Sequence, residues 1–190
     1  MAYADDACRE DYWLVYDAVS VRGLILRVAA LSLRMDYHIV LRAISQDVHA
    51  LLYAHTSYRT DRHLVRKVVT VQGLALQYLQ GPFRDDASLV KKAILQHPDA
   101  LRYAGLALRG DRSFMHWAVT FRGCSLQYAS TSLLCDLQLV LAAVAQDGLA
   151  LRYAAPRLRA DPRVQSHAIE QNPDAARFAY PSASIGEPTP

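Results

Sequence analysis

The sequence predicts an all-α protein, an α-solenoid of seven 25-residue helix-turn-helix repeats. Three observations predict it: an aspartate recurs every 25 residues, no insertion breaks the interval, and apolar residues keep fixed places behind each aspartate. Five columns of residues in one register over seven repeats are not a chance pattern. The leading aspartates, each counted as place 1 of its repeat, are Asp11, Asp36, Asp61, Asp86, Asp111, Asp136 and Asp161.

The first half of each repeat has the pattern of an amphipathic helix. Apolar residues stand at places 4, 5, 8 and 9, as Leu139, Val140, Ala143 and Val144 do in the sixth repeat. These places fall on one stripe of a helix with 3.6 residues per turn. The leading aspartate is a favoured N-cap, because its carboxylate accepts hydrogen bonds from the free amides of the first turn. We therefore expect a helix to begin directly after each aspartate.

The second half of each repeat is expected to hold a second, shorter helix. The alternation in Leu149, Leu151 and Tyr153 would also suit a strand. Other repeats decide against it, because Pro98 and Pro173 are each followed by an aspartate, and proline with an acid marks a helix N-terminus. A short turn over places 20–24 is then expected to lead to the next aspartate.

Two kinds of repeat alternate over the first six repeats, which predicts a 50-residue module made of a pair of repeats, and the seventh repeat, of the second kind, breaks the alternation. The first kind has glycine at place 13, and the second kind has glutamine at place 11. Since no single hairpin can bury its apolar stripe, the neighbouring repeats must cover it. The residues that mark the two kinds are Gly23, Gly73 and Gly123, and Gln46, Gln96, Gln146 and Gln171.

The register also predicts the boundaries of the array. Tyr3-Ala4 occupies the places of Tyr53-Ala54, so residues 1–10 are expected to be the tail of a truncated preceding repeat. Residues 11–180 form a single array. Residues 181–190 break the pattern, are rich in proline and serine, and are expected to be a flexible tail.

The segments Gly73–Tyr78 and Gly148–Ala154, each followed by a turn and a Leu-Val-x-x-Ala helix, resemble the repeat family "domain of unknown function 4116". The resemblance covers residues 3 to 180. It implies a repeated all-helical module in intracellular proteins and no established activity, so it assigns no functional residue. A weaker resemblance to the leucine-rich-repeat variant rests on Asp161, Val164, Ala168, Ile169, Asn172 and Pro173.

Composition excludes several classes of protein. The formal net charge is +3, and no apolar run is long enough to span a membrane. The three cysteines lack paired zinc-ligand spacing, and with no signal peptide they indicate reduced thiols in an intracellular, cytoplasmic protein. The histidines show no metal-binding motif. We therefore predict no catalytic residue, no metal and no cofactor, and a protein that is not an enzyme.

The best candidate for a partner surface lies at places 6 and 7, which face away from the apolar stripe. Stacked repeats are expected to align five cations and an exposed tryptophan on this surface. Such a surface would bind an acidic protein segment, a phosphate or a nucleic acid. The alternative is an ordinary solvated helix face. The candidate residues are Arg42, Arg66, Lys67, Lys91, Lys92 and Trp117.

Two further columns admit a structural and a functional interpretation. The tyrosines at place 18 could stack on bases or could fill the joint between repeats. The arginines at place 24 could bind phosphates or could pair with the next aspartate or with helix carbonyls. The favoured function is a scaffold that binds a protein. The alternatives are a nucleic-acid- or phosphate-binding array and a regulatory region of a larger protein.

Overall fold

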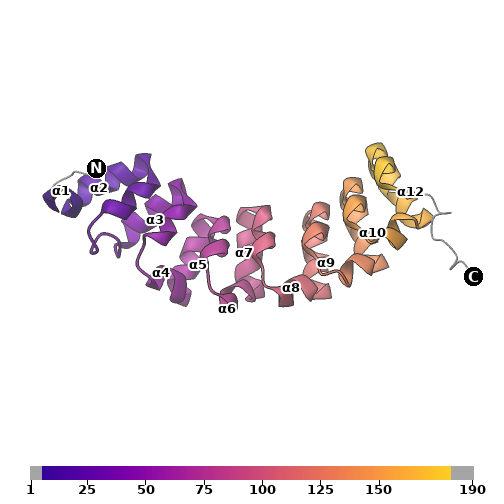
Figure 1. Cartoon of the computed structure of the whole chain (residues 1–190), viewed down its shortest axis with the longest axis horizontal. Coiled ribbons are helices and arrows are strands. Elements are labelled where there is room, and N and C mark those ends of the chain that lie inside the picture. Colours follow the sequence, from indigo (N-terminus) through magenta and orange to yellow (C-terminus); the bar gives the residue numbers. More distant parts are fainter. Residues whose placement is uncertain (1–5, 181–190) are drawn as a thin grey trace, which may run out of the picture. The chain divides into compact units, whose positions relative to one another are not determined.

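The computed structural model describes residues 6–180, and within that range it is entirely helical, without a strand. The chain divides into two compact units: unit 1 ends at Ala104, and unit 2 begins at Gly105. Figure 1 shows the succession of helices along each unit. The all-α, repeat-like fold predicted from the sequence is confirmed. The tail predicted for residues 181–190 lies outside the described residues.

Each leading aspartate is followed by an α-helix of ten residues, as predicted. The carboxylate of Asp36 accepts hydrogen bonds from the amides of His38 and Ile39, at 2.9 and 3.0 Å, and the other six aspartates also accept from first-turn amides. The ten-residue helices are α2 (Tyr12–Val21), α3 (Tyr37–Gln46), α5 (Arg62–Val71), α7 (Ala87–Gln96), α9 (Arg112–Phe121), α10 (Leu137–Gln146) and α12 (Pro162–Gln171).

The second half of each repeat is a 3₁₀ helix of five or six residues. It starts where the sequence predicted a helix, for instance at Pro98 and Pro173. In so short a segment, bonds between residues three apart engage more backbone groups than the longer α-helical spacing. These helices are η1 (Gly23–Val28), η2 (Val48–Leu52), η3 (Gly73–Tyr78), η4 (Pro98–Tyr103), η5 (Gly123–Tyr128), η7 (Gly148–Tyr153) and η8 (Pro173–Phe178).

The segment expected to be a plain turn contains a third helical element, so the predicted helix-turn-helix description was incomplete. Its amides find carbonyl partners within the turn, as Asp61 N does at Ser57 O, 2.8 Å away. These short helices are α4 (Ser57–Thr60), α6 (Gly81–Arg84), α8 (Leu106–Gly110), η6 (Leu133–Cys135) and α11 (Pro156–Arg159), and α1 (Asp6–Glu10) stands in the same position before α2.

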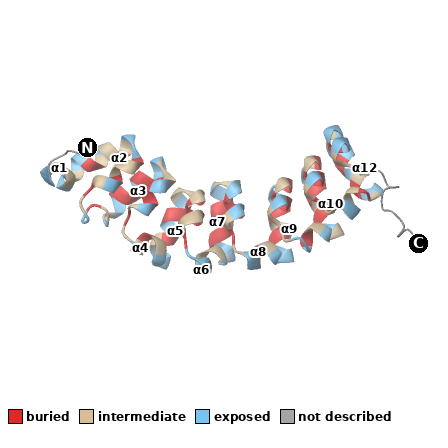
Figure 2. Ribbon diagram, in the orientation of Figure 1, coloured by how far each residue is buried: buried red, intermediate tan, exposed pale blue. Residues whose placement is uncertain are grey.

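The core of each unit runs along the row of long helices (Figure 2). In unit 1, α2, α3, α5 and α7 pack in that order, and in unit 2 α9, α10 and α12 do so. Leucines at place 16 of the 3₁₀ helices, such as Leu51, Leu76 and Leu151, close the core and are fully buried. Burying each such side chain stabilises the fold by about 1.5–3 kcal/mol. Neighbouring repeats thus cover each other's apolar stripes.

Glycine at place 13 lets the 3₁₀ helix lie directly against the next long helix. A Cβ on Gly73 would lie 2.3 Å from the carbonyl oxygen of Ala93, and one on Gly148 would lie 2.3 Å from that of Ala168. A glutamine of the next repeat completes the joint, because Gln96 Oε1 accepts from the amide of Gly73 at 2.6 Å. This joint forms within a module, as at Gly73 and Gln96, and also between the sixth and seventh repeats, as at Gly148 and Gln171.

A backbone hydrogen bond also joins successive repeats. The amide at place 20 donates to the carbonyl at place 24 of the repeat before, as His55 N does to Arg34 O at 3.0 Å and Ala155 N to Leu134 O at 3.0 Å. Because both groups belong to the main chain, this bond tolerates any side chain at these places.

Candidate interaction surface

Five of the six predicted surface residues belong to α3, α5 and α7 of unit 1. Arg42, Arg66, Lys67 and Lys92 are exposed, and Lys91 is half-buried. The three helices pack in succession, so their cations share one side of the unit. None of the three helices contains an aspartate or glutamate. We call these five residues the basic face.

The charges of Arg66, Lys67 and Lys92 are not neutralised by the aspartate caps at the helix N-termini. Asp86 is engaged instead by Arg62, whose guanidinium lies 2.6 Å from its carboxylate. Burial acts to raise the pKa of Asp86, but hydrogen bonds from Leu89 and Ser88 and the charge of Arg62 outweigh burial and lower it. Arg66, Lys67 and Lys92 form no ion pair with any residue from 6 to 180. Their positive charge therefore faces solvent.

Arg42 has a structural contact as well as an exposed charge. Its Nε donates to Ser20 Oγ at 2.9 Å, which ties α3 to α2. A side chain at place 7 thus points back toward the preceding repeat. Arg42 consequently lies at the edge of the basic face, and the lysines of α5 and α7 form its centre.

Trp117, the sixth predicted residue, lies on α9 in unit 2 and is half-buried, so the prediction that it is exposed was wrong. Its ring stacks on Phe121, with centroids 6.1 Å apart and planes inclined by 5°. Phe114 packs against it from the same helix, with ring centroids 5.9 Å apart. In unit 2 the corresponding places of α10 hold only Leu141 and Ala142. The cationic pattern therefore belongs to unit 1.

Two arginines of the column at place 24 donate to carbonyl groups of the next repeat, one of the two roles considered from sequence. Arg34 Nε donates to Tyr53 O at 2.5 Å, and Arg159 Nε donates to Phe178 O at 2.8 Å. Each carbonyl stands at the end of the next repeat's 3₁₀ helix, where backbone acceptors lack helical partners. These guanidinium groups thus help to hold successive repeats together.

The tyrosine column at place 18 consists of half-buried rings. In unit 2 the guanidinium of Arg152 lies 4.6 Å from the Tyr153 ring centroid and 5.9 Å from that of Phe178 in the next repeat. Such cation–π contacts bind neighbouring repeats and occupy part of each ring face. This geometry suits packing between repeats better than a ladder for bases.

Sequence reasoning did not single out an apolar face on α2. Trp13 is 72% exposed, Leu14 43% and Val21 86%. The sequence alone carried no signal of this exposure, because Leu14 stands in the same apolar column as Ile39, which is fully buried.

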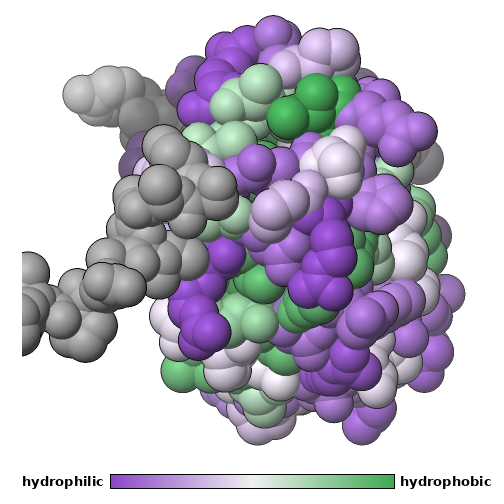
Figure 3. Space-filling view, turned by 90° about the vertical axis from the view of Figure 1, so that its right-hand side faces the viewer, coloured by the Kyte–Doolittle hydropathy of each residue, from purple (hydrophilic) through white to green (hydrophobic). Residues whose placement is uncertain are grey.

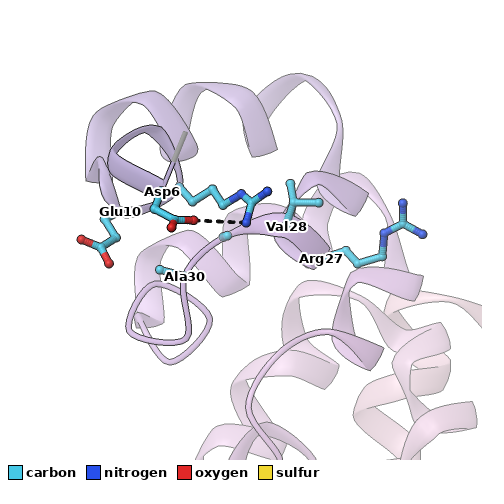
Figure 4. A pocket seen from close by; sticks show the side chains of 7 residues that line it. Asp6, Glu10, Arg27, Val28 and Ala30 are labelled. Carbon is cyan, nitrogen blue, oxygen red and sulfur yellow. Dashed lines mark hydrogen bonds and ion pairs between the residues drawn. The ribbon is translucent and has the colours of Figure 1, made fainter. Parts of the chain in front are cut away.

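A shallow pocket opens between α1 and the end of η1 (Figure 4). An ion pair between Arg9 and Asp6, 3.3 Å long, crosses it, while Glu10 and Arg27 point outward. Charges of both signs line this pocket, so it has no strong preference for an anion or a cation. A second shallow pocket in unit 2 is lined by Cys135, Leu158 and Arg163, among others.

The described residues hold no group of three or more metal-binding side chains. The three cysteines are free thiols. No helix in the described part of the chain is both long and apolar enough to cross a bilayer.

The stacked three-part repeats and their exposed basic face define a helical-repeat protein. Comparison with known families makes the assignment specific: the chain belongs to the family described as "Domain of unknown function (DUF4116)", which matches residues 61–109, 111–159 and 136–182, more than half of the 190 residues. No curated protein and no solved structure matches the chain. Each match begins at a leading aspartate and spans two repeats. Each also contains one glycine–glutamine joint: Gly73 with Gln96, Gly123 with Gln146, and Gly148 with Gln171.

Proposed function

We propose that the chain is a non-enzymatic interaction module that binds an acidic segment of a partner protein on the basic face of unit 1. The observation that carries this proposal is that three successive packed helices supply five cations at the same two places and no carboxylate. Surface ion pairs are individually weak, so one cation would achieve little. A row of cations on a rigid support attracts a row of carboxylates and fixes their orientation.

The spacing of the helices suits an extended acidic segment. Packed helices lie about 8–10 Å apart, so a strand or helix laid across α3, α5 and α7 meets a cation at each step. Lysine side chains adapt to carboxylates of varied position, because their stems are flexible. The basic face itself holds no aromatic ring, whereas proteins that bind single-stranded nucleic acids combine charge with stacking platforms. This composition favours a protein partner over a nucleic acid.

The test measures binding of the full chain to a fluorescent peptide of alternating glutamate and leucine and to a single-stranded RNA of equal charge. Fluorescence anisotropy at several salt concentrations gives both affinities. The variant K67E/K91E/K92E is expected to weaken peptide binding by about tenfold or more, since three of the five attractive contacts become repulsive. The matched control R27E/R102E/R157E reverses three exposed charges outside the basic face and is expected to change affinity by about twofold or less.

Two outcomes contradict the proposal. Tighter binding of the RNA than of the peptide, lost in the K67E/K91E/K92E variant, would assign the face to nucleic acid. Failure of the peptide to bind even at low salt would leave the basic face as a solvated surface.

A further inference from the structure

The side of α2 that carries Leu14, Ala18 and Val21 is exposed, although places 4 and 8 are covered in most later repeats. Leu14 is 43% exposed, whereas Ile39 and Leu89, which occupy place 4 in α3 and α7, are 0% and 2% exposed. Ala18 at place 8 is half-buried, and the residues at place 8 of α3, α5 and α7 are fully buried. Val21 at place 11 is 86% exposed. We call these three residues the α2 face.

The contacts of later helices show what the α2 face points toward. Gln96, at place 11 of α7, accepts from Gly73 N at 2.6 Å and donates to Val71 O at 3.3 Å, and both partners belong to the preceding repeat. Places 4, 8 and 11 share one side of an α-helix. Leu14 and Val21 therefore point to where a repeat ahead of α2 would stack.

The chain ahead of α2 already follows the register of such a repeat. Ala30 N donates to Arg9 O at 3.0 Å, as His55 N donates to Arg34 O at 3.0 Å. Arg9 on α1 thus makes the backbone bond that place 24 makes between later repeats. The backbone part of a joint between repeats is therefore present ahead of α2. The apolar side chains of α2 that would contact the long helix of the preceding repeat are exposed.

The last repeat that the structure describes, which contains α12, has more polar groups on its outer side. In α12, Gln165 replaces the apolar residue of place 5 and donates to Arg159 O at 2.8 Å and to Tyr180 O at 2.7 Å. The small Ala176 stands where the other repeats carry leucine. Figure 3 shows mostly hydrophilic surface on this side. The outer face of a helical repeat that no neighbour covers is ordinarily polar, whereas the α2 face is apolar.

We infer that the α2 face is a docking surface for one further helical repeat, stacked in register and joined through α1. The kind of repeat follows from the glycine–glutamine joint. Val21 corresponds to Val71, and the repeat ahead of Val71 carries Val48 at place 13 instead of glycine. The docking repeat is therefore of the kind that lacks glycine at place 13.

The experiment adds a copy of residues 36–50 directly ahead of Met1 of the full chain. These residues fill places 1–15, and Met1–Glu10 supply places 16–25, so the addition completes one repeat. We expect the Tm to rise by about 4–10 °C, and the amides of α2 to exchange more slowly with deuterium. The control carries the same added residues in scrambled order.

A substitution on the α2 face separates docking from a general effect of a longer chain. V21D is expected to lower the Tm by about 2 °C or less in the original chain, where the side chain is exposed, and by about 5 °C or more in the extended chain. Equal Tm values for the ordered and scrambled additions, or equal effects of V21D in both chains, would overturn the inference. A copy of residues 61–75 carries Gly73. If it raises the Tm as much as the copy of residues 36–50 does, the inference that the docking repeat lacks glycine at place 13 is wrong. These outcomes do not depend on the basic face.

Discussion

The amide of Gly73 donates a 2.6 Å hydrogen bond to the side-chain oxygen of Gln96, and these two residues lie in successive repeats of unit 1. Between α5 and η3 the chain changes from α to 3₁₀ geometry, and backbone groups there lack hydrogen-bond partners within their own helix. The side chain of Gln96 supplies an acceptor for the Gly73 amide. Gly123 with Gln146 and Gly148 with Gln171 make the same bond in unit 2. The same glycine–glutamine bond thus links the third repeat to the fourth, the fifth to the sixth and the sixth to the seventh.

Gly73→Ala is expected to lower the free energy of unfolding by about 1–3 kcal/mol, because the added Cβ meets the backbone oxygen of Ala93 at 2.3 Å and neither helix can yield easily. Urea denaturation followed by circular dichroism measures the change. Gly81→Ala in the same unit is the control, since a Cβ there meets nothing within 4 Å. If Gly73→Ala and Gly81→Ala both lower the free energy of unfolding only slightly, the close approach to Ala93 does not require glycine at position 73.

Gln96→Ala is expected to cost about 1–2 kcal/mol, because the Gly73 amide loses its acceptor and the Val71 carbonyl loses a donor. Hydrogen exchange should show faster exchange of the Gly73 amide in particular. The control, Gln80→Ala, removes an exposed glutamine side chain without a hydrogen bond to any residue from 6 to 180. An unchanged exchange rate at Gly73 would contradict the role of the bond.

Leu51→Ala is expected to destabilise unit 1 by about 2–5 kcal/mol, since Leu51 is fully buried and its removal leaves a cavity. Leu52→Ala, on the next residue of η2, changes a side chain that is 43% exposed and should cost well under half as much. Chemical denaturation of both variants gives the comparison. Similar losses from the two would mean that place 16 does not close the core.

Stability of unit 2 should fall as acid protonates Asp136. The hydrogen bond from Arg112 and then the one from the Leu139 amide lower the pKa of this carboxyl from its ordinary 3.8. Because the folded-state pKa lies below the unfolded one, the contribution is complete above about pH 5 and is lost as the pH falls through the folded-state pKa. Asp136→Asn keeps a capping side chain but should flatten this dependence between pH 5 and 2, at a cost of about 0.5–1 kcal/mol at neutral pH.

The control for the acid experiment is Glu170→Gln, which removes an exposed carboxylate on α12. Thermal unfolding at a series of pH values compares the three proteins. A slope that is as steep in Asp136→Asn as in the original chain would show that other carboxyls carry the acid sensitivity.

Alkali should weaken unit 1 through Tyr58, which is 2% exposed and donates to Met35 O at 3.0 Å. Burial, with smaller contributions from Asp36 and Tyr37, raises the pKa of this phenol to about 12. Since the folded-state pKa exceeds the unfolded value of 10.0, stability is complete below pH 10 and falls between pH 10 and 12.

Ultraviolet absorbance during an alkaline titration checks this expectation, because it detects the phenolate directly. Tyr58→Phe should remove the late-titrating group and cost about 1–2 kcal/mol at neutral pH, since the Met35 carbonyl loses its donor. Tyr103→Phe, on a half-buried ring at the end of η4, is the control. If Tyr58→Phe leaves the titration curve unchanged, the late-titrating phenol is not that of Tyr58.

Most of the local structure followed from the sequence, because it depends on contacts a few residues apart. The N-caps at the seven aspartates, the ten-residue helices and the start of the second helix at Pro98 all follow from local rules of hydrogen bonding and periodicity. The type of the second helix did not follow, since a six-residue segment satisfies either helical pattern by its residues alone. Its length of five or six residues, which only the structure showed, favours the 3₁₀ form.

The candidate surface was only partly predictable for the same reason. Charge at places 6 and 7 is visible in the sequence, and the cations of α3, α5 and α7 do share one unit. The stacking of Trp117 on Phe121 joins residues four apart on one helix, so sequence reasoning could have found it but did not use it. The exposed face of α2 needed the burial of Ile39 and Leu89 for comparison.

The sequence alone determined the register, the long helices, their caps and the apolar columns, because each rests on interactions along one segment of chain. Only the tertiary structure revealed why glycine and glutamine alternate, where the arginines donate and which apolar side chains remain uncovered. Those features join atoms that lie about one repeat apart, and their distances are set by how one repeat packs on the next.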